Sequence, residues 1–165
     1  MVTLTGRQTK NSTLERTFEN RVGSILSKLD IYNFHVEDKM GLPDRYVAGG
    51  NWIEFKRTIW NKRGILHIMP LLRPAQRNRL NMLTRGGDRC WVAVNIYAEM
   101  HNHVIIKPWV WWTENTSVDF KTVRQEADIK RGAARKNNLA KYVSSIFNPR
   151  FERYSNFPSD MPVDL

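Results

Sequence analysis

The sequence lacks the features that build disulfide-rich, zinc-binding or membrane proteins. It contains one cysteine, Cys90, among 165 residues, which excludes a disulfide framework and a zinc site made of several cysteines. No apolar run approaches the roughly 18 residues that a membrane-spanning helix needs. The first residues also lack the apolar core of a signal peptide. We therefore expect a soluble intracellular protein that has no contact with a membrane.

Two common catalytic sequence patterns are also missing. Neither the G-x-S-x-G turn of serine hydrolases nor the phosphate-binding G-x-x-x-x-G-K-[ST] loop occurs, so no nucleotide cofactor is expected. His35 and His67 stand without partners at metal-ligand spacing. His101 and His103 are too close in sequence to form a His-Asn-His nuclease motif, and they are expected to lie in a surface hairpin.

Acidic residues are few relative to basic ones. The chain has 16 Asp and Glu against 26 Lys and Arg, which gives a net charge of +10. Hydrophobic residues make up 41% and charged residues 25%, a composition typical of a folded domain. The charge favours a polyanionic partner, nucleic acid before an anionic membrane surface.

The first half of the sequence predicts a helix followed by a hairpin. Residues 1–11 are polar and basic and are expected to form an arm. A capping box at Ser12 begins a helix of about 17 residues, and a short strand follows within residues 31–36. The hairpin has strands at 45–48 and 52–56 around a Gly49-Gly50-Asn51 turn. The helix carries apolar residues at spacings of three and four: Leu14, Phe18, Val22, Leu26 and Leu29.

The second half predicts further helices and strands. Pro74 is well placed in the first turn of a helix that ends at Gly86-Gly87. Strands are expected at 90–94 and 104–106, and another helix follows after Thr122 with an apolar seam of Leu139, Val143 and Ile146. The order of elements implies an α/β domain. We divide the chain into a basic arm (1–11), a core (12–108), a tryptophan-rich and basic helical extension (109–147) and a tail (148–165).

Three residues of the hairpin carry the chemical signal. Glu54 and Lys56 alternate onto the same strand face, while Ile53 and Phe55 share the other, and the hairpin brings Asp44 beside the pair. Two nearby carboxylates repel each other, and a divalent cation relieves the repulsion. Mg²⁺ binds few carboxylates and leaves positions open for phosphate oxygens, so this arrangement suits metal-assisted phosphodiester hydrolysis. Read separately, E-x-K and Pro-Asp are ordinary strand and turn sequences.

The same residues resemble a nuclease superfamily. The stretch G-L-P-D-R-Y-V (41–47), five residues, then I-E-F-K (53–56) is similar to the PD-(D/E)xK signature, particularly its virus-type replication-repair and Holliday-junction-resolvase-like branches and phage endonuclease I. The resemblance covers residues 12 to about 106. It implies a restriction-endonuclease-like α/β fold, with a mixed central sheet flanked by helices; the basic helical extension lies beyond it.

The resemblance also implies roles for individual residues. Asp44, Glu54 and the backbone carbonyl of Phe55 would bind Mg²⁺, for which Mn²⁺ would substitute, and Lys56 would be the catalytic lysine. Gln76 matches the glutamine of the family's next helix. Glu19, in F-E-N-R-V, matches the acid of the first helix, and Glu15 lies one turn earlier on the same face. We favour Glu19 as a catalytic residue and metal ligand and keep Glu15 as the alternative.

Basic and aromatic residues complete the expected DNA-binding surface. The W-V-W-W cluster of Trp109, Trp111 and Trp112 is interpreted first as core or dimer packing, and second as a stacking surface for bases. By analogy with the family, we expect a homodimer or higher homo-oligomer. The basic residues expected to contact DNA phosphates are Arg57, Lys62, Arg63, Arg77, Lys130, Arg131, Arg135 and Lys136.

The sequence leaves the kind of activity open. The leading hypothesis is a DNA endonuclease in the cytoplasm of a bacterium or a phage-infected cell. It is either structure-selective for junctions and branches or site-specific in the manner of homing and restriction enzymes. The alternative from another class is a non-catalytic basic DNA-binding module whose E-x-K is incidental or inactive. An RNA-directed nuclease is disfavoured by the family resemblance alone.

Overall fold

The computed structural model describes seven segments of the chain. They are residues 6–37, 41–60, 66–67, 71–98, 101–114, 117–118 and 134–148. No helix within these segments is long and apolar enough to cross a membrane. The predicted DNA contacts Lys62, Arg63, Lys130 and Arg131 lie outside the described residues.

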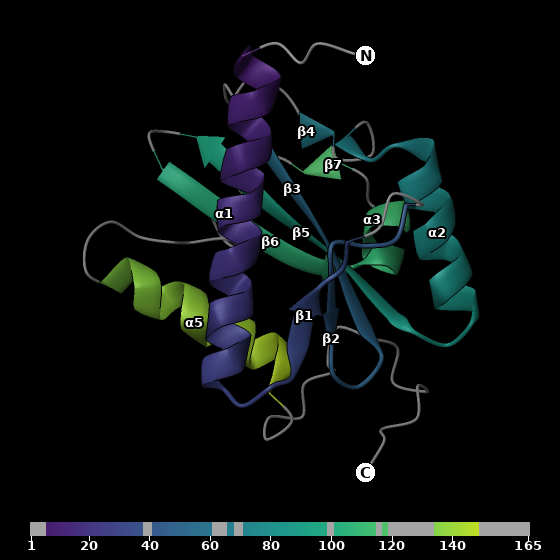
Figure 1. Ribbon diagram of the computed structural model, residues 1–165. Helices are drawn as coiled ribbons and strands as arrows, with labels where there is room; N and C mark the ends of the chain where they lie inside the picture. Colours follow the sequence, from purple (N-terminus) through teal and green to yellow (C-terminus); the bar gives the residue numbers. More distant parts are fainter. Residues whose placement is uncertain are drawn as a thin grey trace.

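A five-stranded mixed sheet forms the centre of the fold (Figure 1). The strand order is β1-β2-β3-β5-β6, with β3 and β5 parallel and every other neighbouring pair antiparallel. The short strands β4 (Leu66–His67) and β7 (Ser117–Val118) pair separately. The five strands of the main sheet are β1 (Asn33–His35), β2 (Arg45–Val47), β3 (Asn51–Ile59), β5 (Arg89–Ala98) and β6 (His101–Pro108).

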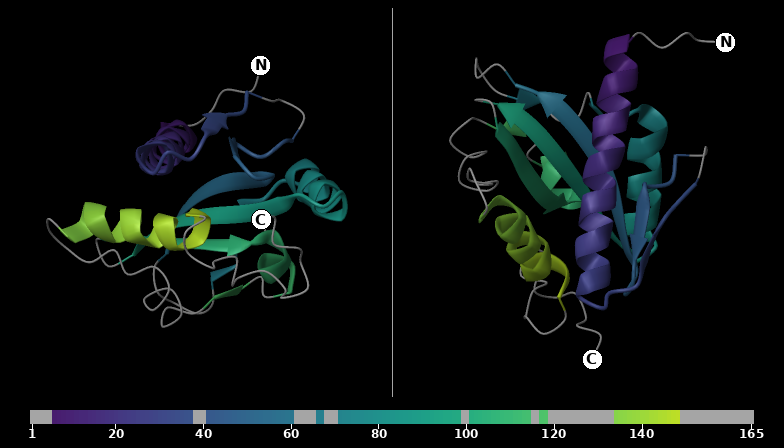
Figure 2. Two further views of the ribbon diagram at one scale, coloured as in Figure 1. Left: turned by 90° about the horizontal axis from the view of Figure 1, so that it is seen from below. Right: turned by 60° about the vertical axis from the view of Figure 1, so that its left-hand side comes forward.

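Helices cover both faces of this sheet. One face packs against α1 (Gly6–Lys28) and α5 (Ala134–Phe147), which lie on the near side of the sheet in the right-hand view of Figure 2. The other face packs against α2 (Pro74–Arg85) and α3 (Trp109–Glu114). The expected fold class, a mixed α/β sheet flanked by helices, is therefore confirmed.

Side-chain alternation along β3 separates the two cores. Ile53 and Phe55 are buried with Phe18 and Val22 of α1 in the core on one side. Trp52 packs against the opposite core, to which α2 and α3 contribute. Because successive strand residues point to opposite faces, Glu54 and Lys56 belong with Trp52, as the sequence predicts.

The hairpin forms close to its predicted position. Gly49 and Gly50 have φ values of +95° and +77°, a backbone region that glycine enters at little cost. The turn comprises residues 48–50, and Asn51 already pairs with Val47. Asn51 therefore starts β3 instead of ending the turn. Its side chain still serves the turn, because its Nδ2 donates to the carbonyl of Ala48 at 3.1 Å.

The first helix is longer than predicted. It begins at Gly6, so residues 6–11 are helical and the predicted arm at 1–11 is wrong over these positions. Arg, Gln and Lys have high helix propensity, and a polar stretch can therefore continue a helix whose apolar stripe begins later. The helix predicted from Pro74 to Gly86 is confirmed within a residue.

The extension after residue 108 completes the two cores. Trp109 and Trp112 of α3 are buried in the core beside α2, which confirms the packing interpretation of these two tryptophans. The predicted apolar seam of α5 is also confirmed, because Leu139, Val143 and Ile146 are buried against the other face. The hairpin predicted around His101 and His103 is confirmed, because Ala98 pairs with His101 across the antiparallel strands β5 and β6. Its predicted surface position is wrong at His103, whose side chain is 6% exposed.

Candidate active site at the open edge of strand β3

The site forms where β2 stops pairing with β3. The last register pair between these strands is Arg45 with Ile53, so the following residues of β3 have no strand partner on that side among the described elements. Two carboxylates accept hydrogen bonds from backbone amides of β3 that a neighbouring strand would otherwise accept. The Phe55 amide donates to Asp44 Oδ2 at 2.8 Å, and the Arg57 amide donates to Glu15 Oε2 at 3.2 Å. Asp44 and Glu15 therefore line the open edge of β3.

A tight approach to α2 positions Asp44. Gly41 has a φ of +87°, and a Cβ at this residue would lie 3.1 Å from the carbonyl oxygen of Ala75. Only glycine fits such a conformation and contact easily. Pro43 is buried and fixes its own φ. The segment before β2 is thus held against the first turn of α2, which places Asp44 at the site. Glu54 and Lys56 belong to β3, the central strand of the sheet, and Asp44 lies beside that strand.

Glu54 is the most enclosed member of the site. It is 1% exposed, and its Oε1 lies 3.0 Å from Lys56 Nζ. The same oxygen accepts a hydrogen bond of 2.7 Å from Gln76 Nε2. Gln76 Oε1 in turn accepts from the Arg73 amide at the start of α2, at 2.9 Å. The glutamine therefore ties the carboxylate to a helix terminus, and its amide orientation is fixed at both ends.

Burial and neighbouring negative charges raise the pKa of three carboxyl groups. Desolvation, followed by the charge of Asp44, raises the pKa of Glu54 to about 8 in spite of Lys56. Desolvation also raises the pKa of Asp44, although the Phe55 amide and Lys56 oppose the shift. The pKa of Glu15 is raised in the same way, by burial first and with a contribution from Asp44. A cation would stabilise the ionised forms of these acids, because Glu54 is buried, Asp44 and Glu15 are half-buried, and the charge of Asp44 disfavours the ionisation of the other two.

The donor atoms suit a hard divalent cation. In a strand, the N–H and C=O of one residue point to the same side, so the Phe55 carbonyl is directed toward Asp44. Among the described residues, no three His, Cys, Asp or Glu side chains are grouped closely enough to enclose a metal. Mg²⁺ does not require such a cage, because it binds through one or two carboxylates and keeps several waters. Asp44, Glu54 and the Phe55 carbonyl fit this requirement.

A pocket of about 150 Å³ lies beside Asp44. Its wall includes Glu15, Glu19, His35 and Phe55, with Arg16 at the rim. Arg16 is the exposed member, since its side chain is 49% accessible. The pocket therefore connects the open edge of β3 with solvent.

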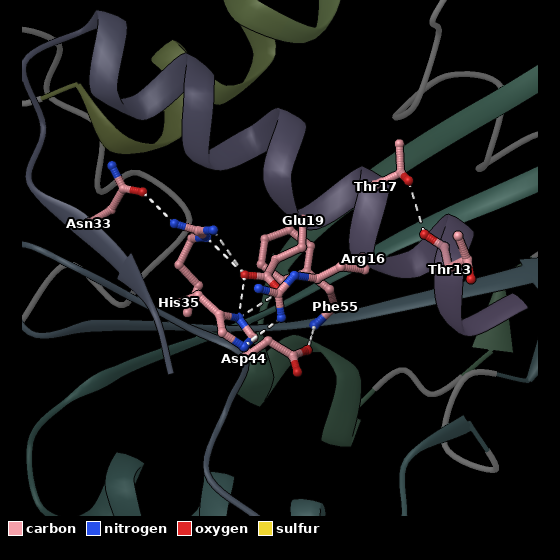
Figure 3. A network of polar contacts seen from close by, with 9 residues as sticks. Thr13, Arg16, Thr17, Glu19, Asn33, His35, Asp44 and Phe55 are labelled. Carbon is pink, nitrogen blue, oxygen red and sulfur yellow. Dashed lines mark hydrogen bonds and ion pairs between the residues drawn. The ribbon is translucent and has the colours of Figure 1, made fainter. Parts of the chain in front are cut away.

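Glu19 is engaged in a separate ion network (Figure 3). Its Oε2 lies 2.8 Å from His35 Nδ1 and 3.0 Å from one terminal nitrogen of Arg45, and Arg45 Nε donates to it at 3.1 Å. Glu19 and Arg45 are 3% and 8% exposed. The carboxylate is thus occupied by His35 and Arg45, and Arg16 Nε lies 3.9 Å from its Oε1. Its charge also contributes to the raised pKa of Asp44. Glu15, one turn earlier, accepts from the Arg57 amide at the open edge of β3 and interacts with Lys56 and Asp44, so the geometry favours Glu15 as the acid from α1.

His35 is a site residue that the sequence alone does not identify. Its Nε2 lies 2.6 Å from a terminal nitrogen of Arg16, and a guanidinium can only donate. Nε2 therefore accepts, and Nδ1 carries the hydrogen donated to Glu19. No local spacing links His35 to Glu19, because the two residues come from different elements, and only the packing of α1 against β1 brings them together.

Gly23→Ala is expected to destabilise the protein, although this change normally stabilises a helix interior by up to about 1 kcal/mol. A Cβ at Gly23 would lie 2.6 Å from Arg45 Cζ. Arg45 cannot move aside without losing its contacts with Glu19 and Asn33. We expect thermal unfolding to show a lower Tm, by about 2–4 °C for each kcal/mol of stability that is lost. Gly86→Ala is the matched control, because its φ is −75° and its added Cβ would meet only ordinary contacts; an equal shift in both variants would contradict the explanation.

The remaining predicted DNA contacts are distributed over several elements. The side chain of Arg57 is directed to another part of the surface. Its Cζ lies 5.8 Å from the centroid of the Tyr97 ring, and it lines a second pocket of about 170 Å³ together with Arg21 and Asn95. Arg77 lies on α2 next to Gln76. Arg135 and Lys136 belong to the first turn of α5. Arg57 and Arg77 are therefore sequence neighbours of the site residues Lys56 and Gln76, and their contact with DNA stays a prediction.

Comparisons with known proteins find similar chains among solved structures. No protein-family model matches the sequence, and no curated protein matches it. A solved structure that is similar is the 1.6 Å structure of Hjc, a Holliday junction resolvase from the archaeal hyperthermophile Archaeoglobus fulgidus. The identity is 18%, the match covers 76% of this chain and 98% of that chain, and the TM-score is 0.44. At these values we draw no functional conclusion from the similarity.

Proposed function

We propose that the protein is a Mg²⁺-dependent endonuclease that hydrolyses phosphodiester bonds in DNA, with Mn²⁺ able to replace Mg²⁺. One observation carries the proposal. Glu54 is buried and Asp44 is half-buried at an open strand edge, Lys56 Nζ lies 3.0 Å from Glu54 Oε1, and burial together with the charge of Asp44 raises the pKa of Glu54. A net charge of +10 is consistent with a polyanionic substrate.

Each residue has a separate task in this proposal. Asp44, Glu54 and the Phe55 carbonyl would hold the cation, with Glu15 as a further acid nearby. The bound Mg²⁺ would supply Lewis-acid stabilisation of the phosphate charge. Lys56 would orient the attacking water or stabilise negative charge on the phosphate. Gln76 holds Glu54 in place through its 2.7 Å hydrogen bond.

Cleavage assays with Lys56→Ala test the proposal. We expect the wild type to cut DNA with Mg²⁺ and not with EDTA, and the variant to be about 10²–10⁴-fold slower. The panel contains plain duplex, single strands, a flap, a four-way junction and a long genomic duplex. Lys28→Ala is the control, because Lys28 is an exposed lysine at the end of α1. DNA binding without cleavage under every metal tried would identify a DNA-binding module instead.

The assembly and location of the protein stay predictions. Enzymes that cut both strands of a duplex often do so with two subunits, and a homodimer is the arrangement we expect by analogy. Sedimentation of the wild type with and without DNA would test it. The bacterial or phage-infected cytoplasm is proposed on the same basis.

A further inference from the structure

Four aromatic rings form a continuous row across β1, β2 and β3. The ring centroids of Tyr32 and Phe34 are 5.9 Å apart, those of Phe34 and Tyr46 are 5.3 Å apart, and those of Tyr46 and Trp52 are 5.1 Å apart. Register pairs Phe34 with Tyr46 and Tyr46 with Trp52, so these three rings share one sheet face. We call these four residues the aromatic row.

The inner half of the aromatic row is fixed and the outer half is exposed. Trp52 Nε1 donates to Asp88 Oδ2 at 3.0 Å, and the Tyr46 hydroxyl accepts from the Gly50 amide at 3.3 Å. Tyr32 and Phe34 are 70% and 43% exposed. Large aromatic side chains are costly to leave in water. Two exposed rings supported by two anchored rings therefore form a preorganised contact surface.

The aromatic row begins next to the candidate active site. Trp52 lies two residues before Glu54 on the same face of β3. A strand rises by about 3.3 Å per residue and neighbouring strands lie about 4.8 Å apart, so the backbone at Phe34 is roughly 12 Å from that at Glu54. This distance corresponds to about three or four stacked nucleotides at 3.4 Å each.

We propose that the aromatic row binds unpaired bases of a branched or single-stranded DNA segment next to the cleavage site. The inference rests on the proposed function and narrows its substrate to DNA that carries unpaired nucleotides. The partner of a chain with a charge of +10 is expected to be polyanionic. Aromatic rings bind unpaired bases by stacking regardless of sequence, whereas bases inside an intact duplex do not offer their faces.

The size of the surface favours bases over a second copy of the chain. An aromatic side chain has about 150–250 Å² of surface, so the exposed parts of Tyr32 and Phe34 amount to roughly 250 Å². A stable protein–protein interface requires about 800 Å² from each partner. One or two bases would cover the exposed rings completely.

Binding assays without metal test this inference independently of cleavage. The double variant Tyr32→Ala/Phe34→Ala is expected to bind a duplex with a single-stranded tail at least 10-fold more weakly than the wild type does. Its binding to plain duplex is expected to stay within twofold. Tyr32→Trp/Phe34→Trp should retain tail binding, and Ile59→Ala is the control, because Ile59 is an exposed apolar residue of β3, 57% accessible.

Each outcome has a defined meaning. Equal affinities of wild type and double variant for the tailed duplex, or equal losses on both DNAs, would overturn the inference. A change in sedimentation from dimer to monomer would also overturn it and identify a second copy as the occupant. If the wild type cleaves DNA and Lys56→Ala does not, but the aromatic-row variant binds the tailed duplex as the wild type does, the proposed function stands and this inference fails. Tail-specific loss in a protein that never cleaves would leave the base-binding surface and remove the endonuclease.

Discussion

Glu54→Gln is expected to reduce Mg²⁺-supported DNA cleavage about 1,000-fold or more. The change keeps the shape of the side chain and its acceptor for Gln76, but it removes a charge that the proposed cation requires. Single-turnover cleavage of the preferred DNA in the wild type and the variant measures the effect. DNA affinity without metal should change little, which separates catalysis from binding.

Cleavage by the wild type is also expected to depend on pH through Glu54. Burial and the Asp44 charge raise the pKa of Glu54 to about 8, so the group is largely protonated below that pH when no cation is bound. A divalent cation must displace this proton. At subsaturating Mg²⁺ the cleavage rate should therefore rise by up to tenfold per pH unit from pH 6 to about 8 and level off above it.

The raised pKa of Glu54 also predicts how the stability of the metal-free protein depends on pH. The folded-state pKa of Glu54 is raised above its ordinary value of 4.5. The folded state thus binds the proton more tightly than the unfolded state, and stability is lost as the pH rises from about 4.5 through 8. Glu54→Gln cannot ionise, and its Tm at pH 9 is expected to exceed that of the wild type by on the order of 5–10 °C.

Glu37→Gln provides the control for both measurements. Glu37 is an exposed carboxylate just after β1, and its neutralisation should leave cleavage and the pH profile of the Tm unchanged. Full activity in Glu54→Gln would remove Glu54 from the site. A wild-type Tm that does not fall between pH 6 and 9 would contradict the buried, repelled state of this carboxyl group.

Glu19→Gln is expected to cause the largest loss of stability. It leaves Arg45, which is 8% exposed, without a negative partner, and removing one member of a buried ion pair typically costs about 3–5 kcal/mol. A decrease in Tm of about 10 °C is expected. Glu15→Gln is the matched change one turn earlier. Burial already raises the pKa of Glu15, so its neutralisation should not lower the Tm, but it should slow cleavage about tenfold or more.

The pair of variants decides which acid of α1 serves the proposed active site. Thermal unfolding and cleavage per folded molecule are measured for each. Unchanged stability with abolished cleavage in Glu19→Gln would assign the acid to Glu19, as the family resemblance suggests. The acid is assigned to Glu15 if Glu15→Gln stays folded and its DNA cleavage is slowed.

The hairpin was predictable because its signals are local. The positions of Glu54 and Lys56 on one face follow from the two-residue period of a strand, and Gly49-Gly50 marks the turn by a conformation that other residues avoid. Asp44 follows from the same geometry. These three residues are separated by at most twelve positions, so the hairpin brings them near one another, and the packing of Gly41 against α2 then fixes the position of Asp44.

The choice between Glu15 and Glu19 depends on packing that no local pattern records. Residues four apart lie on the same helix face, so their spacing does not separate them, and only the family resemblance favoured Glu19. The translation of α1 along the sheet decides that Glu15 meets the Arg57 amide and that Glu19 meets Arg45. The burial of His103 on β6 also follows from tertiary packing, and a polar tripeptide in isolation predicts a surface instead.

The early end of β2 has a consequence for how the protein avoids unwanted association. A strand edge with unsatisfied amides invites an extended segment of another chain to add as a further strand. At the open edge of β3, Asp44 accepts from the Phe55 amide and Glu15 accepts from the Arg57 amide. The acids that we assign to cation binding thus also occupy two of the donors that an incoming strand would need, and they protect a central strand from edge-to-edge aggregation.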